Sequence, residues 1–147
     1  SLFACYYIGT KEGEEQQKIT VNGKDYELST KLGTGKKIEE KFKVPLVQLF
    51  GKLGDALSSE LTDIIAIAAG KADDSGFMQE IDDNWDYSDL YNTVQELVLR
   101  FQFSGSPADI ERKLVKYPGN VELKNAIREL LGVPIPKPAL PESTGLN

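Results

Sequence analysis

The chain has 147 residues, of which 40% are hydrophobic and 27% are charged, so it can bury a core of its own. Seventeen basic and 23 acidic residues give a net charge of −6, which argues against a protein that binds the nucleic-acid phosphate backbone. Histidine is absent, which excludes Ser–His and Cys–His catalytic pairs and histidine metal sites.

The first apolar run, Leu2–Ile8, is rich in aromatic residues and ends at a glycine, which favours a β-strand. It contains the only cysteine, Cys5, which we expect to be a small buried strand residue. The run is too short to cross a membrane and lacks the basic start of a signal peptide. We therefore expect a cytoplasmic protein that makes no membrane contact.

A β-hairpin is predicted between residues 18 and 28. Asn22-Gly23 favours a two-residue type I′ turn, because both residues tolerate a positive φ. This turn pairs Val21 with Lys24 and Ile19 with Tyr26, and it places the apolar residues of both strands on one face.

Six or seven short helices are expected after the hairpin, from apolar residues at helical spacing and from capping residues. Thr34 is predicted to cap the first helix, Ser88 the fifth, and Asn120 the last. A break near Gly54 within the second helix is left open. The predicted ranges are 34–42, 45–57, 61–70, 77–85, 88–101, 107–116 and 121–131.

The predicted architecture is α+β: a small antiparallel β element, made of the strand 2–8 and the hairpin, followed by a bundle of short helices. Residues 1–132 are expected to form a single domain. Residues 133–147 contain four prolines and are expected to form a flexible tail.

Charge is distributed unevenly along the chain. Residues 55–96 hold eleven acidic residues and one basic residue, Lys71, a net charge of −10, which leaves +4 on the rest of the chain. This segment could attract a basic partner or could simply keep an exposed surface soluble.

No residue pattern indicates an enzyme, a cofactor or a metal site. Four alternating oxygen-bearing residues suggest a calcium-binding loop: Asp82, Asn84, Asp86 and Ser88. The loop positions that require Gly and Glu hold Tyr87 and Thr93, so a calcium loop of this type is not present. Carboxylate pairs drawn from Asp82, Asp83 and Asp86 have no nucleophile or oxyanion device beside them.

Three aromatic residues lie beside the acidic run: Trp85, Tyr87 and Tyr91. Aromatic residues between short helices commonly belong to the core. The alternative is that some of them anchor a partner, because Trp and Tyr dominate interface hot spots.

Three stretches together resemble the tail assembly chaperones of long-tailed phages and prophages of Gram-positive bacteria. They are the hairpin 19–28 with the helix 31–42, the small-residue helix 61–70, and the acidic turn 82–90 leading into the helix 94–101. The resemblance covers roughly residues 18–103. The strand 2–8 and the two helices after Pro107 have no counterpart in it.

The resemblance implies a protein that works by binding and not by catalysis. Such chaperones bind the long helical tape measure protein during tail assembly, keep it soluble and recruit tail tube protein subunits. The implied partners are therefore the tape measure protein and the tail tube protein, in the cytoplasm of the bacterial host. Self-association is left open.

Two other functions are weighed against this one. The chain could be a small regulatory adaptor whose prolines are read by a partner domain: Pro134, Pro136, Pro138 and Pro141. It could also be a carboxylate-dependent metal or hydrolytic enzyme, which stabilisation by a divalent cation would reveal.

Overall fold

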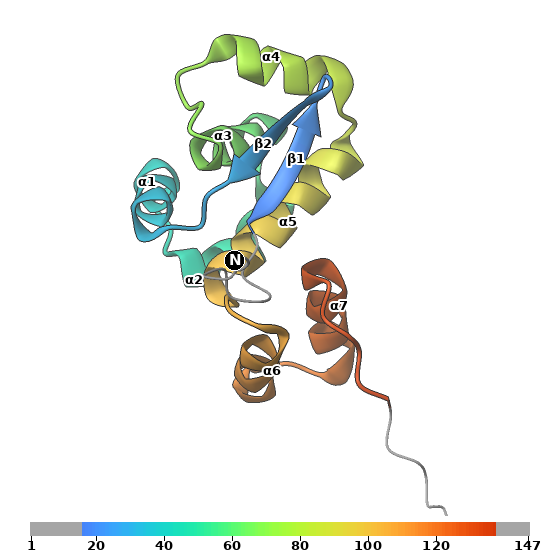
Figure 1. The fold of residues 1–147 in the computed structure, drawn as a ribbon. Coiled ribbons are helices and arrows are strands. Elements are labelled where there is room, and N and C mark those ends of the chain that lie inside the picture. Colours follow the sequence, from blue (N-terminus) through green and yellow to red (C-terminus); the bar gives the residue numbers. More distant parts are fainter. Residues whose placement is uncertain (1–15, 138–147) are drawn as a thin grey trace, which may run out of the picture.

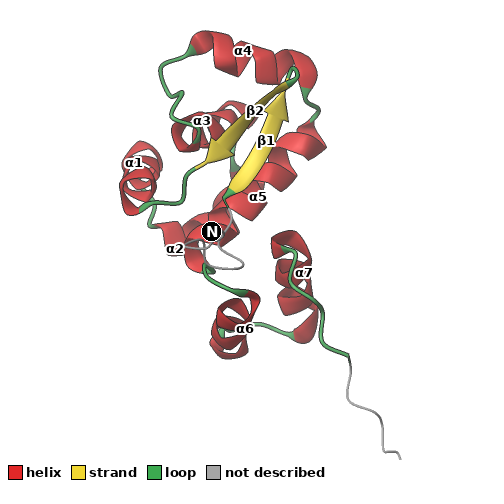
Figure 2. Cartoon of the chain, in the orientation of Figure 1, coloured by secondary structure: helices red, strands yellow, loops and turns green. Residues whose placement is uncertain are grey.

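The computed structural model describes residues 16–137, which form a two-stranded antiparallel sheet followed by a set of helices (Figures 1 and 2). The predicted α+β class is confirmed. The strand expected at residues 2–8, with Cys5, and most of the proline-rich tail lie outside the described residues.

The hairpin consists of β1 (Gln17–Val21) and β2 (Lys24–Leu28). Its register is the predicted one, with Val21 opposite Lys24 and Ile19 opposite Tyr26. The turn residues Asn22 and Gly23 have φ values of 50° and 79°, as a type I′ turn requires. The apolar face of the hairpin is turned toward the helices, and the opposite face is polar and exposed.

The first two helices are short. Helix α1 (Leu32–Phe42) begins two residues before the predicted start, so the prediction of Thr34 as its cap is wrong. The Thr34 hydroxyl instead donates a hydrogen bond to the Ser29 hydroxyl, 2.9 Å away. Helix α2 (Leu46–Lys52) passes into a single 3₁₀ turn, η1 (Leu53–Asp55), so the helix does break near Gly54.

Helix α3 (Ser58–Ala68) is the most buried element of the fold. It contacts α1, α4, α5 and β2, and its carbonyl at Ala68 accepts a hydrogen bond from the Ser29 N–H at 2.9 Å. Small side chains such as Ala66 and Ala68 let these neighbours approach closely from several sides.

Helices α4 (Ser75–Asn84) and α5 (Tyr87–Gln102) are joined by a sharp turn at Trp85 and Asp86. The Asp86 carboxylate accepts a hydrogen bond from the Asp89 N–H at 2.8 Å and thereby caps α5. The prediction of Ser88 as the cap is therefore wrong, because a carboxylate two residues earlier already satisfies the first turn.

Helices α6 (Pro107–Lys116) and α7 (Val121–Leu131) form a hairpin beyond the carboxyl end of α5, away from α4 (Figure 1). Asn120 caps α7 as predicted, and Gly132 ends it in the left-handed conformation with a φ of 72°. Leu123, near the start of α7, is 37% exposed.

Two clusters of buried side chains hold the fold together. The first joins the hairpin to α1–α5, and the second joins the end of α5 to α6 and α7. Phe50 of α2 packs against both clusters. Val133 belongs to the second cluster and is buried, and its N–H donates to the Arg128 carbonyl at 2.9 Å.

Candidate functional site

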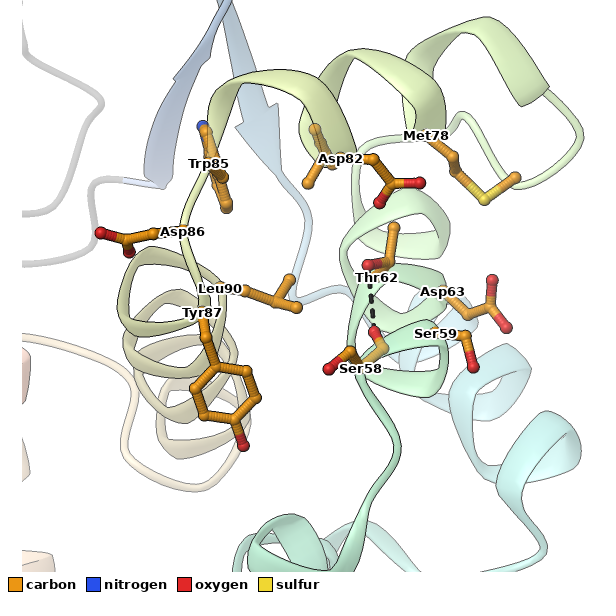
Figure 3. A pocket seen from close by; sticks show the side chains of 11 residues that line it. Ser58, Ser59, Thr62, Asp63, Met78, Asp82, Trp85, Asp86, Tyr87 and Leu90 are labelled. Carbon is orange, nitrogen blue, oxygen red and sulfur yellow. Dashed lines mark hydrogen bonds between the residues drawn. The ribbon is translucent and has the colours of Figure 1, made fainter.

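An open groove lies where α3, α4 and α5 meet, with a volume of about 560 Å³ (Figure 3). Its size is within the range of roughly 300 to 1,000 Å³ that is usual for ligand sites. Its apolar side chains come from α4, the following turn and α5: Met78, Ile81, Trp85, Tyr87 and Leu90. Its polar side chains come from α3, α4 and the turn: Ser58, Ser59, Thr62, Asp63, Asp82 and Asp86.

The groove has an apolar base and an exposed rim. Ile81 and Leu90 are buried and form the bottom, where they continue the first core cluster. Met78 and Trp85 are half-buried, and Tyr87 is 55% exposed. A ligand side chain that entered the groove would therefore meet apolar surface that is already desolvated at its base.

The α3 side of the groove is lined by small residues. Ser58 and Ser59 are exposed at the first turn of the helix, and Thr62 is buried one turn further on. The Thr62 hydroxyl donates to the Ser58 carbonyl at 3.0 Å, which leaves it internally satisfied (Figure 3). This wall therefore offers little side-chain bulk, and the space between α3 and Tyr87 stays open.

Charge around the groove has one sign. Asp63, Asp82 and Asp86 contribute carboxylates, and none of the residues that line it is basic. Asp63 lies 3.7 Å from the Lys41 ammonium group, a weak surface ion pair. Among the described residues Asp82 takes part in no ion pair, so its charge faces solvent.

The structure brings two of the three predicted aromatic residues to this groove. Trp85 and Tyr87 line it, whereas Tyr91 does not. The Tyr91 ring stacks on the Tyr87 ring, with 5.8 Å between centroids and 19° between planes, and it packs against the first core cluster. Tyr91 therefore supports the position of Tyr87.

Trp85 has a second contact that the sequence did not indicate. Its indole Nε1 donates a hydrogen bond to the backbone carbonyl of Thr20 in β1, at 3.1 Å. One end of this side chain thus holds the hairpin, while its ring lines the groove (Figure 3).

The groove residues of α3, and Met78 and Ile81 of α4, were not predicted as site residues from the sequence. Met78 follows the core residue Phe77 and has no pattern that marks it as a ligand contact. The residues 58–63 lie far from Trp85 along the chain, and only the packing of α3 against α5 brings them there. The acidic bias of residues 55–96 was the one signal that covered both walls.

Between residues 16 and 137, no group of three or more His, Cys, Asp or Glu side chains is placed to hold a metal ion. None of the helices in this part of the chain combines the length and apolar character that crossing a lipid bilayer requires.

Comparison of the chain with known protein families, with curated proteins and with solved structures gives no match. The residues of the groove and the resemblance of residues 18–103 are therefore the features that bear on function.

Proposed function

We propose that this protein is a non-catalytic tail assembly chaperone that binds the tape measure protein of a long-tailed phage or prophage and helps to recruit tail tube subunits. The observation that carries the proposal is the groove between α3, α4 and α5, in which an apolar base meets exposed Tyr87 and a rim of carboxylates. The binding face lies within the stretch, residues 18–103, on which the resemblance to such chaperones rests.

An apolar groove of this kind suits a chaperone better than an enzyme. A chaperone must shield apolar side chains of an unassembled partner and release them later, which favours an open site over an enclosed pocket. The carboxylate rim would keep the chaperone soluble and would repel nucleic acid in the same cell.

The direct test is co-expression with the tape measure protein encoded in the same operon. We expect the tape measure protein to become more soluble and to co-purify with this chain. Tyr87→Ser should weaken the co-purification, because Tyr87 is the most exposed apolar residue of the groove. Val115→Ser is the control, since Val115 is 67% exposed on α6, outside the groove. Unchanged solubility and no co-purification with the unaltered chain would refute the proposed function.

A further inference from the structure

We infer that the groove between α3, α4 and α5 binds an amphipathic α-helix that carries Lys or Arg beside its apolar stripe. This inference rests on the proposed function, because it names the chemistry of the segment that the chaperone would hold. It is argued from the walls, the base and the charge of the groove.

The helical walls of the groove are poorly suited to an extended ligand. A strand that binds by β-addition needs a free row of backbone N–H and C=O groups on the receptor. Here the walls are helices, whose backbone groups are paired within each helix apart from the first and last turns. A helical ligand satisfies its own backbone and needs only side-chain contacts from such walls.

The Leu57 and Asp89 N–H groups, at the starts of α3 and α5, are not available to a ligand either. The Leu57 N–H at the start of α3 donates to the Glu60 carboxylate at 2.8 Å. The Asp89 N–H at the start of α5 donates to the Asp86 carboxylate at 2.8 Å. Carboxylates of the chain itself thus already occupy these helix ends, which leaves them poor sites for a phosphate or another anion.

The base of the groove selects apolar side chains, and its rim selects cations. Ile81 of α4 and Leu90 of α5 form the apolar base, and Met78 of α4 adds apolar surface beside it. Asp82 on α4 carries charge at the edge of the groove, whereas the Asp86 side chain points away from it and caps α5 (Figure 3). None of the lining side chains is basic. A helix whose apolar stripe enters the groove would place flanking Lys or Arg residues beside Asp82.

The distribution of charge along the whole chain favours the same ligand. Residues 55–96, which supply every residue of the groove, carry a net charge of −10 on a chain whose remainder carries +4. The attraction for a basic segment is therefore concentrated on this side of the protein, where it raises the rate of productive encounters.

The test uses the full chain and synthetic peptides, so it does not depend on the tape measure protein. Trp85 is the only tryptophan and lines the groove, so its fluorescence reports on occupancy. The probe is an 18-residue helical peptide with leucines on one face and lysines beside them. Two peptides serve for comparison. In the first, every lysine is replaced by glutamate. The second is a proline-rich peptide with the same length and charge as the lysine peptide.

We expect the lysine peptide to shift Trp85 emission to shorter wavelength and to bind at least about tenfold more tightly than the glutamate peptide. Asp82→Lys should weaken binding about tenfold, and Asp83→Lys, one residue further along α4 and outside the groove, by less than about threefold. Binding should also weaken as salt is raised.

Three outcomes would overturn the inference. They are equal binding of the lysine and glutamate peptides, equal weakening by Asp82→Lys and Asp83→Lys, and preference for the proline-rich peptide. Peptide binding without capture of the tape measure protein would instead refute the proposed function and leave this inference standing. If the tape measure protein is captured equally well by the Asp82→Lys variant, this inference is refuted and the proposed function still stands.

Discussion

The indole Nε1 of Trp85 donates a hydrogen bond to the carbonyl oxygen of Thr20, 3.1 Å away, across 65 residues of chain. This contact fastens the turn between α4 and α5 to the edge of the hairpin. The same ring lines the groove, so one side chain links the stability of the hairpin to the shape of the candidate binding site.

Replacing this donor should reduce stability more than replacing the neighbouring tyrosine. Trp85→Phe keeps an aromatic ring but loses the hydrogen bond, and we expect the free energy of unfolding to fall by about 1 kcal/mol. The free energy of unfolding is measured by urea unfolding, with circular dichroism as the signal because the variant has no tryptophan fluorescence. Tyr87→Phe is the control and should stay within about 0.5 kcal/mol of the unaltered protein. Equal stability of all three proteins would show that the Thr20 contact contributes nothing measurable.

Two glycines of α1 should respond to alanine in opposite ways. A Cβ atom at Gly33 would meet nothing within 4 Å, so Gly33→Ala should raise the free energy of unfolding by about 0.5 to 1 kcal/mol through helix propensity. A Cβ atom at Gly35 would lie 2.8 Å from Leu46 Cδ1 and 3.2 Å from Phe101 Cε1.

Gly35→Ala must displace those side chains, and we expect a net loss of about 1 kcal/mol. The two melting temperatures should therefore move in opposite directions. A stabilised Gly35→Ala variant would mean that α2 and α5 can move away from α1 at no cost.

The C-terminal helical hairpin depends on an ion pair between α6 and α7. Arg128 is only 7% exposed, and its Nε and Nη2 donate to the two Glu111 oxygens at 2.9 and 2.6 Å. Glu111→Gln leaves the buried guanidinium without its counter-charge. We expect a loss of about 1 to 2 kcal/mol, since the exposure of the Glu111 side chain moderates the effect. Glu122→Gln, on an exposed residue at the start of α7, is the matched control in thermal unfolding.

The same pair predicts how stability depends on pH. The hydrogen bond from Arg128 holds the pKa of Glu111 below its ordinary value of 4.5, and the opposing effect of burial is smaller. A group with a depressed pKa in the folded state stabilises the protein above its ordinary pKa and stops doing so as the pH falls through the lowered value. The stability difference between the unaltered chain and Glu111→Gln should thus be constant near pH 7 and shrink below pH 4.5. A difference that stayed constant at low pH would contradict this assignment.

The proline-rich tail separates the chaperone from the adaptor hypothesis. Deleting residues 134–147 keeps Val133, which is buried in the second cluster, so the fold should remain intact. The chaperone proposal expects this shortened chain to capture the tape measure protein as well as the full chain does, in the same co-purification assay. Loss of capture upon this deletion alone would favour an adaptor whose prolines are the binding element.

Local signals in the sequence determined the hairpin register and the boundaries of the last two helices, α6 and α7. Asn22-Gly23 favours a type I′ turn, and Asn120 caps α7 as predicted. Ser106 caps α6 directly before the predicted start at Pro107. At the start of α5 two residues could serve as the cap. Asp86 does so: the Trp85 indole is hydrogen-bonded to Thr20, and α5 begins at Tyr87, directly after Asp86.

Only the tertiary structure decided where the candidate site lies. Trp85 and Tyr87 were recognisable as aromatic residues in an acidic stretch, but no periodicity shows that Ser58, Ser59 and Thr62 face them. That placement results from α3 packing against α4 and α5, a long-range contact that depends on the summed burial of many side chains. Charge and composition thus specified an acidic segment, and packing specified the groove in which we propose that a basic helix binds.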